Sequence, residues 1–234
     1  MQQPDRQHLA RNVAEVRERM AEAALKAGRR PADVQLCAVC KGQPSRLLLD
    51  AAGLDIDAFG ENRAQEMAVH LGDNAYQGKP CHFIGHLQTN KVRQVVGNAA
   101  LIHSTDSERL LSAINRAATR LDIVQDVLIQ INIGQEATKT GASPDALQPL
   151  LNHASGLTNL RVRGLMAIPP AFDNGPESRR YFALMRALLD KAQAWMPAAP
   201  LDILSMGMTD SFEAAILEGA TIVRVGRAIF GARP

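Results

Sequence analysis

The sequence predicts an α/β protein that folds as a single (β/α)8 barrel with an extra helix before the first strand. Short apolar runs recur eight times along the 234 residues. Amphipathic stretches separate these runs, and strands that alternate with helices form parallel βαβ units. One more amphipathic stretch precedes the first run, with Leu9, Val13, Val16 and Met20 on one helical face.

The eight apolar runs are the expected strands. Most are rich in Val, Ile and Leu without polar alternation, which is typical of parallel strands buried on both faces. The alternative is an open doubly wound sheet, but no G-x-G-x-x-G motif follows the first run, so a closed TIM barrel is favoured. The runs are Val34–Val39, Ala58–Gly60 (short and weak), Cys81–Gly85, Leu101–Ser104, Val127–Ile133, Val162–Ile168, Leu201–Met206 and Thr221–Val225.

Helix signals lie between the runs. The segment from Thr105 to Glu108 has the pattern of a capping box, so a helix is expected to begin there. Pro144 can open another helix. A helical period of apolar residues follows Tyr181. The sequence ends soon after the eighth run, so we expect the N-terminal helix to cover wall that a last helix would otherwise cover.

Composition favours one globular domain over residues 1–234, a common size for such barrels. Lys plus Arg number 26 and Asp plus Glu number 24, a net charge of +2, and aromatic residues make up 4%, so nucleic acid is not an expected partner. The N-terminus lacks the apolar core of a signal peptide, and no 18-residue apolar stretch occurs. We therefore expect no membrane span and a cytoplasmic protein.

The chemistry of such a barrel is expected where the strands end. Lys41 ends the first run and shares a strand face with Val39 and Cys37. Desolvation at an apolar barrel mouth would free a lysine amine for Schiff-base formation. The alternative is an exposed lysine just beyond the strand, where most lysines lie.

The loops after the last two strands are candidates for a phosphate site. Ser205, Gly207 and Thr209 belong to the first loop, and Gly226 and Arg227 to the second. Hydroxyl groups can donate hydrogen bonds, and glycines allow close approach of the backbone to an anion. The alternative is that Thr209 to Ser211 form a helix N-cap, with Asp210 and Glu213 as capping partners.

Two polar residues at strand ends leave alternatives open. Arg224 lies inside an apolar run, where an arginine is costly unless it is paired. It could enter the barrel toward a ligand, or form a salt bridge with Glu61 as one partner. Asn62 could contact a ligand or cap the next helix.

The three cysteines Cys37, Cys40 and Cys81 are too few for a disulfide scaffold. Cys37 and Cys40 form a C-x-x-C motif, but positions i and i+3 of a strand face opposite ways, so a dithiol or a shared metal is not expected. The six histidines show no H-x-x-x-H spacing. We predict no metal site.

Seven ordered segments, which together run nearly end to end, carry a family resemblance. The chain resembles the pyridoxal-phosphate homeostasis proteins of the YggS/PROSC type, whose fold is like the N-terminal barrel domain of alanine racemase. The segments are AVCKGQP around Lys41, FGENRAQE at Phe59–Glu66, HFIGHLQTNK at His82–Lys91, LIQINIGQEATKTG at Leu128–Gly141, LRVRGLMAIPP at Leu160–Pro170, LSMGMTDSFEAAILEGAT at Leu204–Thr221, and VRVGRAIFGAR at Val223–Arg233.

This resemblance implies that the domain binds pyridoxal 5′-phosphate (PLP), the active form of vitamin B6. Lys41 would carry it as a Schiff base, Arg224 would face the pyridine ring, and Asn62 would lie near the cofactor. Ser205, Gly207, Gly226 and the position that follows would hold the phosphate. That last position departs from the family, because Arg227 stands where Thr or Ser is usual. Cys40 stands where Ser is usual, with little expected effect.

The resemblance favours a PLP carrier that maintains PLP homeostasis, without catalytic residues, over a PLP-dependent amino-acid racemase. Racemisation needs an acid/base group on each face of the substrate carbon. In racemases of this kind a tyrosine from a further domain supplies the second group. The sequence has only Tyr76 and Tyr181, and neither lies at an expected strand end. Apo PLP-dependent enzymes are candidate recipients of the cofactor, and a monomer is expected.

Overall fold

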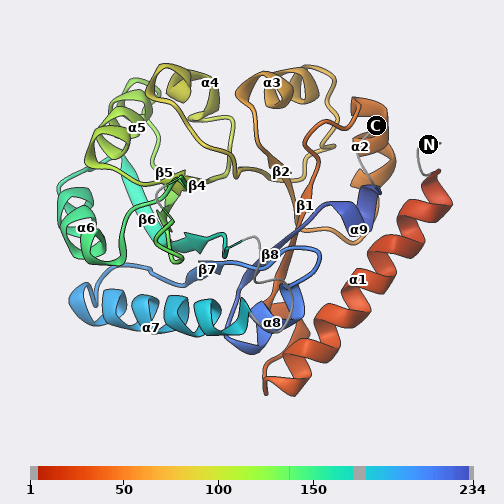
Figure 1. The fold of residues 1–234 in the computed structure, drawn as a ribbon. Coiled ribbons are helices and arrows are strands. Elements are labelled where there is room, and N and C mark those ends of the chain that lie inside the picture. Colours follow the sequence, from red (N-terminus) through yellow and green to blue (C-terminus); the bar gives the residue numbers. More distant parts are fainter. Residues whose placement is uncertain (1–4, 137, 171–177, 232–234) are drawn as a thin grey trace.

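The computed structural model describes residues 5–136, 138–170 and 178–231, and in them eight parallel strands close into a barrel (Figure 1). The strands pair in sequence order, and β1 closes the barrel by pairing with β8. The predicted fold class is confirmed. The strands are β1 (Gln35–Val39), β2 (Ala58–Glu61), β3 (Cys81–Phe83), β4 (Leu101–Thr105), β5 (Gln125–Ile131), β6 (Leu160–Ala167), β7 (Ile203–Ser205) and β8 (Ile222–Val225).

The strands separate two apolar layers, as both-sided burial requires. The barrel interior contains a small cluster of Cys37, Leu101, Leu128, Met166 and Ile222. The larger cluster lies between the outer faces of the strands and the helices. Even the short second run forms a strand, β2, with all four residues buried.

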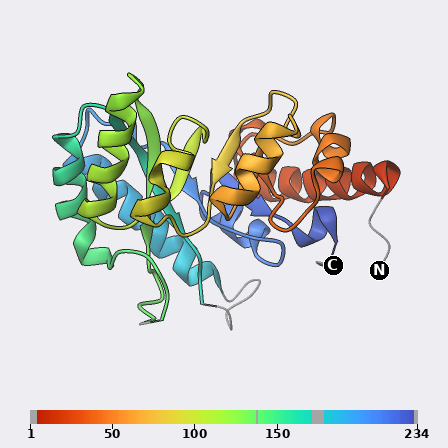
Figure 2. The same cartoon turned by 90° about the horizontal axis from the view of Figure 1, so that it is seen from above.

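Helices surround the barrel (Figures 1 and 2). The N-terminal helix α1 packs against α2, α8 and α9, and its buried side chains include Leu9, Val13, Val16 and Met20. It therefore covers the part of the barrel surface beside the single-turn helix α9, as expected. The α-helices are α1 (Arg6–Lys26), α2 (Ser45–Ala52), α3 (Ala64–Gly72), α4 (Val92–Val95), α5 (Glu108–Arg120), α6 (Leu147–Ser155), α7 (Arg179–Trp195), α8 (Phe212–Leu217) and α9 (Arg227–Phe230).

The helix signals between the strands locate α5 and α6 with small shifts. The expected capping box at Thr105 is wrong, because Thr105 is the last residue of β4 and its hydroxyl donates to the Leu128 carbonyl. Ser107 is the N-cap of α5 and accepts from the Leu110 N–H. Pro144 begins a 3₁₀ turn, Pro144–Ala146, that leads into α6.

Within the described residues, we find no helix that is both long enough and apolar enough to cross a bilayer.

Candidate functional site

A cavity of about 480 Å³ lies at the carboxyl ends of the strands, a volume within the range of small-ligand sites. Six of the eight predicted site residues line it; Ser205 and Gly207 do not. The six are Lys41, Asn62, Thr209, Arg224, Gly226 and Arg227. Segments far apart in the sequence thus meet at one cavity because a closed parallel barrel brings all its strand ends together.

Lys41 occupies the corner of a tight turn that follows β1. The Gln43 N–H donates to the Cys40 carbonyl at 3.0 Å, and Gly42 has a φ of +71°. A positive φ at the third turn position is typical of a type II turn and favours glycine there. Lys41 is half-buried and lines the cavity together with Val39, whereas Cys37 lies deeper in the barrel.

The two cysteines of the C-x-x-C motif face opposite sides of β1, as expected. Cys37 belongs to the interior cluster. The Cys40 thiol lies outside the barrel and donates to Glu61 Oε1 at 3.0 Å. Burial raises the pKa of the Cys37 thiol to about 12 and raises the pKa of Cys40 as well, so both are held as thiols.

Arg224 points into the barrel from β8 and borders the floor of the cavity. Its side chain is buried and donates to Ser205 Oγ at 2.5 Å and to the Ala167 carbonyl at 2.9 Å. Burial lowers the pKa of the guanidinium to about 10, so it keeps its charge at neutral pH. The alternative of a salt bridge to Glu61 is wrong, since Glu61 has other partners.

Behind Arg224, a chain of hydrogen bonds crosses the barrel interior. Ser205 Oγ lies 3.0 Å from His103 Nδ1, and His103 Nε2 lies 3.2 Å from His82 Nδ1. Because Arg224 can only donate, the Ser205 hydroxyl is left to donate to His103, which in turn donates to His82. Burial lowers the pKa of His103, and lowers that of His82 to about 4, so both rings are neutral at pH 7.

The Ser205 hydroxyl is therefore used inside the barrel, and a direct contact from it to a phosphate stays a prediction. Gly207 lies in the loop that follows, with a φ of +91°, and an added Cβ would lie 2.6 Å from Ala215 Cβ. This backbone conformation and this space both require glycine. Gly207 thus shapes the loop that carries Thr209 to the cavity.

Arg227 and Asp210 join the two loops expected to form the phosphate site. The Arg227 guanidinium donates to both carboxylate oxygens of Asp210, at 2.5 and 2.7 Å, and both side chains are exposed. The alternative of Asp210 and Glu213 as capping partners is wrong. Ser211 is the N-cap residue of α8, Asp210 pairs with Arg227, and Glu213 accepts from Arg19.

Asn62 follows β2 and lines the cavity wall. Its Oδ1 is buried and has no hydrogen-bond partner among the described residues. A buried amide oxygen without a partner is costly, so this atom is suited to receive a donor from a ligand. Gly85 permits the placement, because a Cβ there would lie 2.1 Å from the Asn62 carbonyl oxygen.

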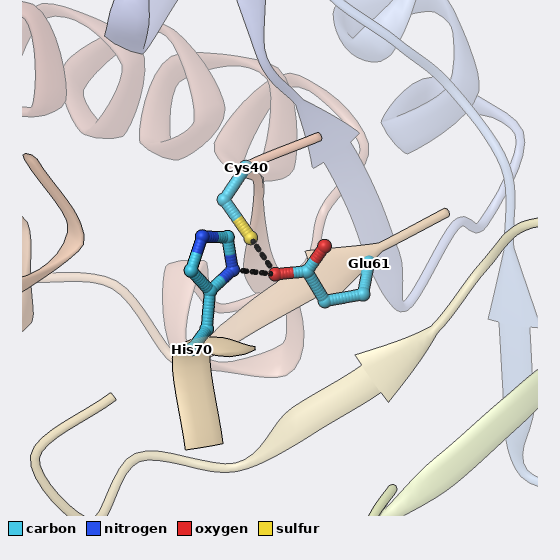
Figure 3. A group of neighbouring side chains, drawn as sticks. All are labelled: Cys40, Glu61 and His70. Atoms are coloured by element: carbon cyan, nitrogen blue, oxygen red, sulfur yellow. Dashed lines mark hydrogen bonds and ion pairs between the residues drawn. The ribbon is translucent and has the colours of Figure 1, made fainter. Parts of the chain in front are cut away.

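A buried polar cluster that the sequence did not predict includes Cys40, the residue before Lys41 (Figure 3). Glu61 Oε1 lies 2.6 Å from His70 Nδ1 and accepts from Cys40 and from the Tyr76 hydroxyl, at 2.9 Å. Glu61 and His70 are at most 5% exposed. One signal could have revealed it: Glu66 and His70 are spaced i, i+4 on α3, so they share the helix face that meets Glu61.

Cys40, Glu61 and His70 offer atoms of the kinds that bind metals, within 4.8 Å of one another. Around a tetrahedral zinc ion, ligands bound at about 2.0–2.3 Å lie roughly 3.3–3.5 Å apart. The distances of 2.6 and 3.0 Å to Glu61 Oε1 are shorter and have the spacing of hydrogen bonds. We therefore interpret this trio as a hydrogen-bonded cluster.

The comparisons with known proteins agree with this architecture. The family described as "Alanine racemase, N-terminal domain" matches residues 5–234. The chain is 41% identical to the pyridoxal phosphate homeostasis protein of Aquifex aeolicus, over 94% of this chain and 96% of that protein. It is 38% identical to the protein of the same name from Escherichia coli K12, over 96% and 97%. The chain belongs to the pyridoxal phosphate homeostasis protein family.

Two solved structures have a fold similar to that of this chain. PipY of Synechococcus elongatus, in a structure with PLP bound, has a TM-score of 0.80 and 33% identity, over 92% of this chain and all of that one. Alanine racemase from Corynebacterium glutamicum shares 18% identity and a TM-score of 0.69, over 97% of this chain but 62% of that one. The second likeness shows a shared fold alone.

Proposed function

We propose that this protein binds PLP at the cavity, holds it on Lys41 as a Schiff base, and serves vitamin B6 homeostasis as a carrier. The observation that carries the proposal is that Lys41 and Arg224 line one cavity with the loops after β7 and β8. The family name and the PLP-bound PipY structure support the choice of ligand.

The donor set of the cavity fits the chemical groups of PLP. Lys41 offers an amine for the aldehyde, and Arg224 is a fixed donor for the pyridine nitrogen because Ser205 and Ala167 hold its guanidinium. Asn62 Oδ1, buried and without a partner among the described residues, can accept from the ring hydroxyl. When bound, the cofactor supplies an electrophilic aldehyde and an aromatic ring that withdraws electrons.

The phosphate belongs at the loops after β7 and β8. We propose that Thr209, Gly226 and the backbone shaped by Gly207 hold it. An added Cβ at Gly226 would lie 3.1 Å from the Val39 carbonyl, so the backbone of that loop packs closely on the end of β1. Arg227 replaces the usual hydroxyl residue, but both carboxylate oxygens of Asp210 already pair with its guanidinium, so the hydroxyl of Thr209 and the backbone of the two loops remain the expected phosphate donors.

The arrangement favours a carrier over a racemase. Tyr76 is buried against Glu61, and burial raises the pKa of its hydroxyl. Tyr181 lies on α7, and neither tyrosine is among the residues that line the cavity. The described cavity therefore offers no tyrosine as a second acid/base opposite Lys41.

We further propose that residues 1–234 act as one domain, that the protein is a cytoplasmic monomer, and that apo PLP-dependent enzymes receive its cofactor. Transfer to an apo-enzyme in the presence of a scavenger for free PLP separates direct delivery from release. Light scattering of the loaded protein tests the oligomeric state.

The assignment of Lys41 is tested by titrating the purified protein with PLP and following the visible absorbance of the adduct. Lys41→Ala should abolish the band and its trapping by borohydride, because the amine that forms the bond is gone. Lys26→Ala, at an exposed lysine of α1, is the matched control and should bind like the wild type. A reducible adduct of equal yield on Lys41→Ala would refute the assignment.

The carrier proposal is tested with the loaded protein and alanine or other amino acids. We expect negligible racemisation. Turnover in the ordinary enzyme range of about 1–10³ per second would overturn it.

A further inference from the structure

Cys40, Gly42 and Gln43, which flank Lys41, each form a hydrogen bond with a residue of β2 or α3. The Cys40 thiol, one residue before Lys41, donates to Glu61 Oε1 at 3.0 Å and lies 3.3 Å from the Gly60 carbonyl. The Gly42 N–H, one residue after it, donates to Glu66 Oε2 at 3.1 Å. The Gln43 carbonyl lies 3.0 Å from His70 Nε2. These contacts all lie on the side of the turn that faces β2 and α3.

The two sides of the turn therefore differ. On one side Lys41 borders the cavity, and on the other the backbone is attached to a buried polar cluster. Glu61 is 0% exposed, and the His70 side chain is 5% exposed (Figure 3). Buried groups of this kind are costly unless they are bonded, and each keeps its geometry because its partners are fixed.

Proton counting shows why His70 can reach both partners. The Gln43 carbonyl can only accept, so Nε2 must carry a proton. The other nitrogen faces Glu61 Oε1, which already accepts from Cys40 and Tyr76, whereas Glu61 Oε2 is buried without a partner among the described residues. A protonated ring donates to both acceptors at once. The hydrogen bond that His70 donates to Glu61 raises the pKa of His70, in agreement with this count.

We propose that Glu61, Glu66 and His70 are positioning residues that hold the Cys40–Gln43 turn so that the Lys41 amine is presented to the cavity. None of the three lines the cavity, so they act through the turn. The expected effect on PLP binding rests on the proposed function of Lys41, whereas the expected effect on the conformation of the turn does not. If the turn samples other conformations, the apparent dissociation constant for PLP rises in inverse proportion to the fraction of molecules whose turn is competent to bind.

The test uses Glu66→Ala, which removes the bond to Gly42 from a partly exposed side chain and leaves the buried pair intact. Arg63→Ala is the matched control, because Arg63 pairs with Glu66 at 3.3 Å, is 76% exposed, and among the described residues has no hydrogen bond to the turn. Hydrogen exchange of the protein without PLP should speed up at Gly42 about tenfold or more in Glu66→Ala, since a bond to a charged acceptor protects that amide. Arg63→Ala should exchange like the wild type.

The same two variants are then titrated with PLP. Glu66→Ala should show a severalfold higher apparent dissociation constant for PLP, with only the small fall of the urea unfolding midpoint that the loss of one hydrogen bond causes. A second pair probes the buried site: His70→Lys keeps a cation that can donate to Glu61 and Gln43, whereas His70→Met removes both donors. His70→Lys should therefore bind PLP more tightly than His70→Met when both are folded by circular dichroism.

Two results would overturn the inference. One is exchange at Gly42 and PLP affinity in Glu66→Ala that match Arg63→Ala. The other is an acceleration spread over the whole chain, which would indicate a role in stability only. If the wild type takes up no PLP, the proposed function fails, yet the exchange experiment still decides whether α3 holds the turn.

Discussion

At the scale of single residues, the site depends on how Arg224 is kept charged inside the barrel. An unpaired buried guanidinium would be strongly destabilising. Here Ser205 and the Ala167 carbonyl accept from it, and His103 in turn accepts from Ser205. Ser205, whose hydroxyl was expected to bind the phosphate directly, therefore holds Arg224, the residue expected to face the pyridine ring.

Ser205→Ala should lower the free energy of unfolding by about 1–3 kcal/mol, because it removes an acceptor from a buried charged donor. Ser104→Ala is the matched control. Ser104 is buried in the neighbouring strand β4, and its hydroxyl has no partner among the described residues. Its loss should therefore change stability little. Urea denaturation of both variants gives the comparison, and equal losses would contradict the role of Ser205.

At the scale of elements, one glycine lets the neighbouring strands β6 and β7 approach each other. Gly164 in β6 has a φ of +149°, and an added Cβ would lie 1.8 Å from the Ile203 carbonyl oxygen of β7. The pairing of β5 with β6 shifts register between Val127 and Leu128, opposite this position. An irregularity in β6 thus requires glycine, and the β6–β7 pairing that ends at Ser205 follows from it.

Gly164→Ala should destabilise the protein by more than the roughly 1–3 kcal/mol of a strained backbone, because the Cβ also overlaps a backbone atom. Gly156→Ala serves as the control. It lies at the end of α6 with a φ of −83°, and the nearest atom to its added Cβ is 3.6 Å away. Its effect should stay within about 1 kcal/mol. Thermal and urea unfolding would reveal whether the two glycines differ in this way.

At the scale of the whole molecule, two neutral histidines in the barrel make stability depend on pH. The folded-state pKa values of His82 and His103 lie below the ordinary value of 6.5, mainly through burial. Arg224 opposes protonation of His103, and Asp57 partly favours that of His82. Above pH 6.5 the rings are neutral in both states, so their stabilising effect is complete there.

As the pH falls from 6.5 toward about 4, the unfolded chain binds protons that folded His82 does not, so the free energy of unfolding should fall. His70 acts in the opposite direction, because its raised pKa lets the folded chain bind that proton before the unfolded chain does, so between pH 7 and pH 5 it offsets part of the loss. Urea titrations at pH 7 and pH 5 measure the effect. His82→Gln should lessen the loss, and exposed His8→Gln should not. An equal slope in all three proteins would contradict this account.

The order of the elements and the residue types at the strand ends could be predicted from the amino-acid sequence. Eight apolar runs without alternation must be buried on both faces, as in a doubly wound sheet or a closed barrel, and the lack of a G-x-G-x-x-G motif after the first run favoured the barrel. The residues that follow those runs then share one end of the barrel, so Lys41, Asn62, Thr209, Arg224, Gly226 and Arg227 could be predicted as neighbours.

The hydrogen bonds that these residues make could not be predicted in the same way, because they depend on how the chain folds in space. Partners such as Arg224 and Ser205, or His70 and Gln43, are 19 and 27 positions apart in the chain. No local pattern specifies such pairs, because they depend on strand register and on the space left by neighbouring side chains. For the same reason the sequence suggested Glu61 as an ion-pair partner of Arg224. In the structure α3 packs against β2, and the partner of Glu61 is His70.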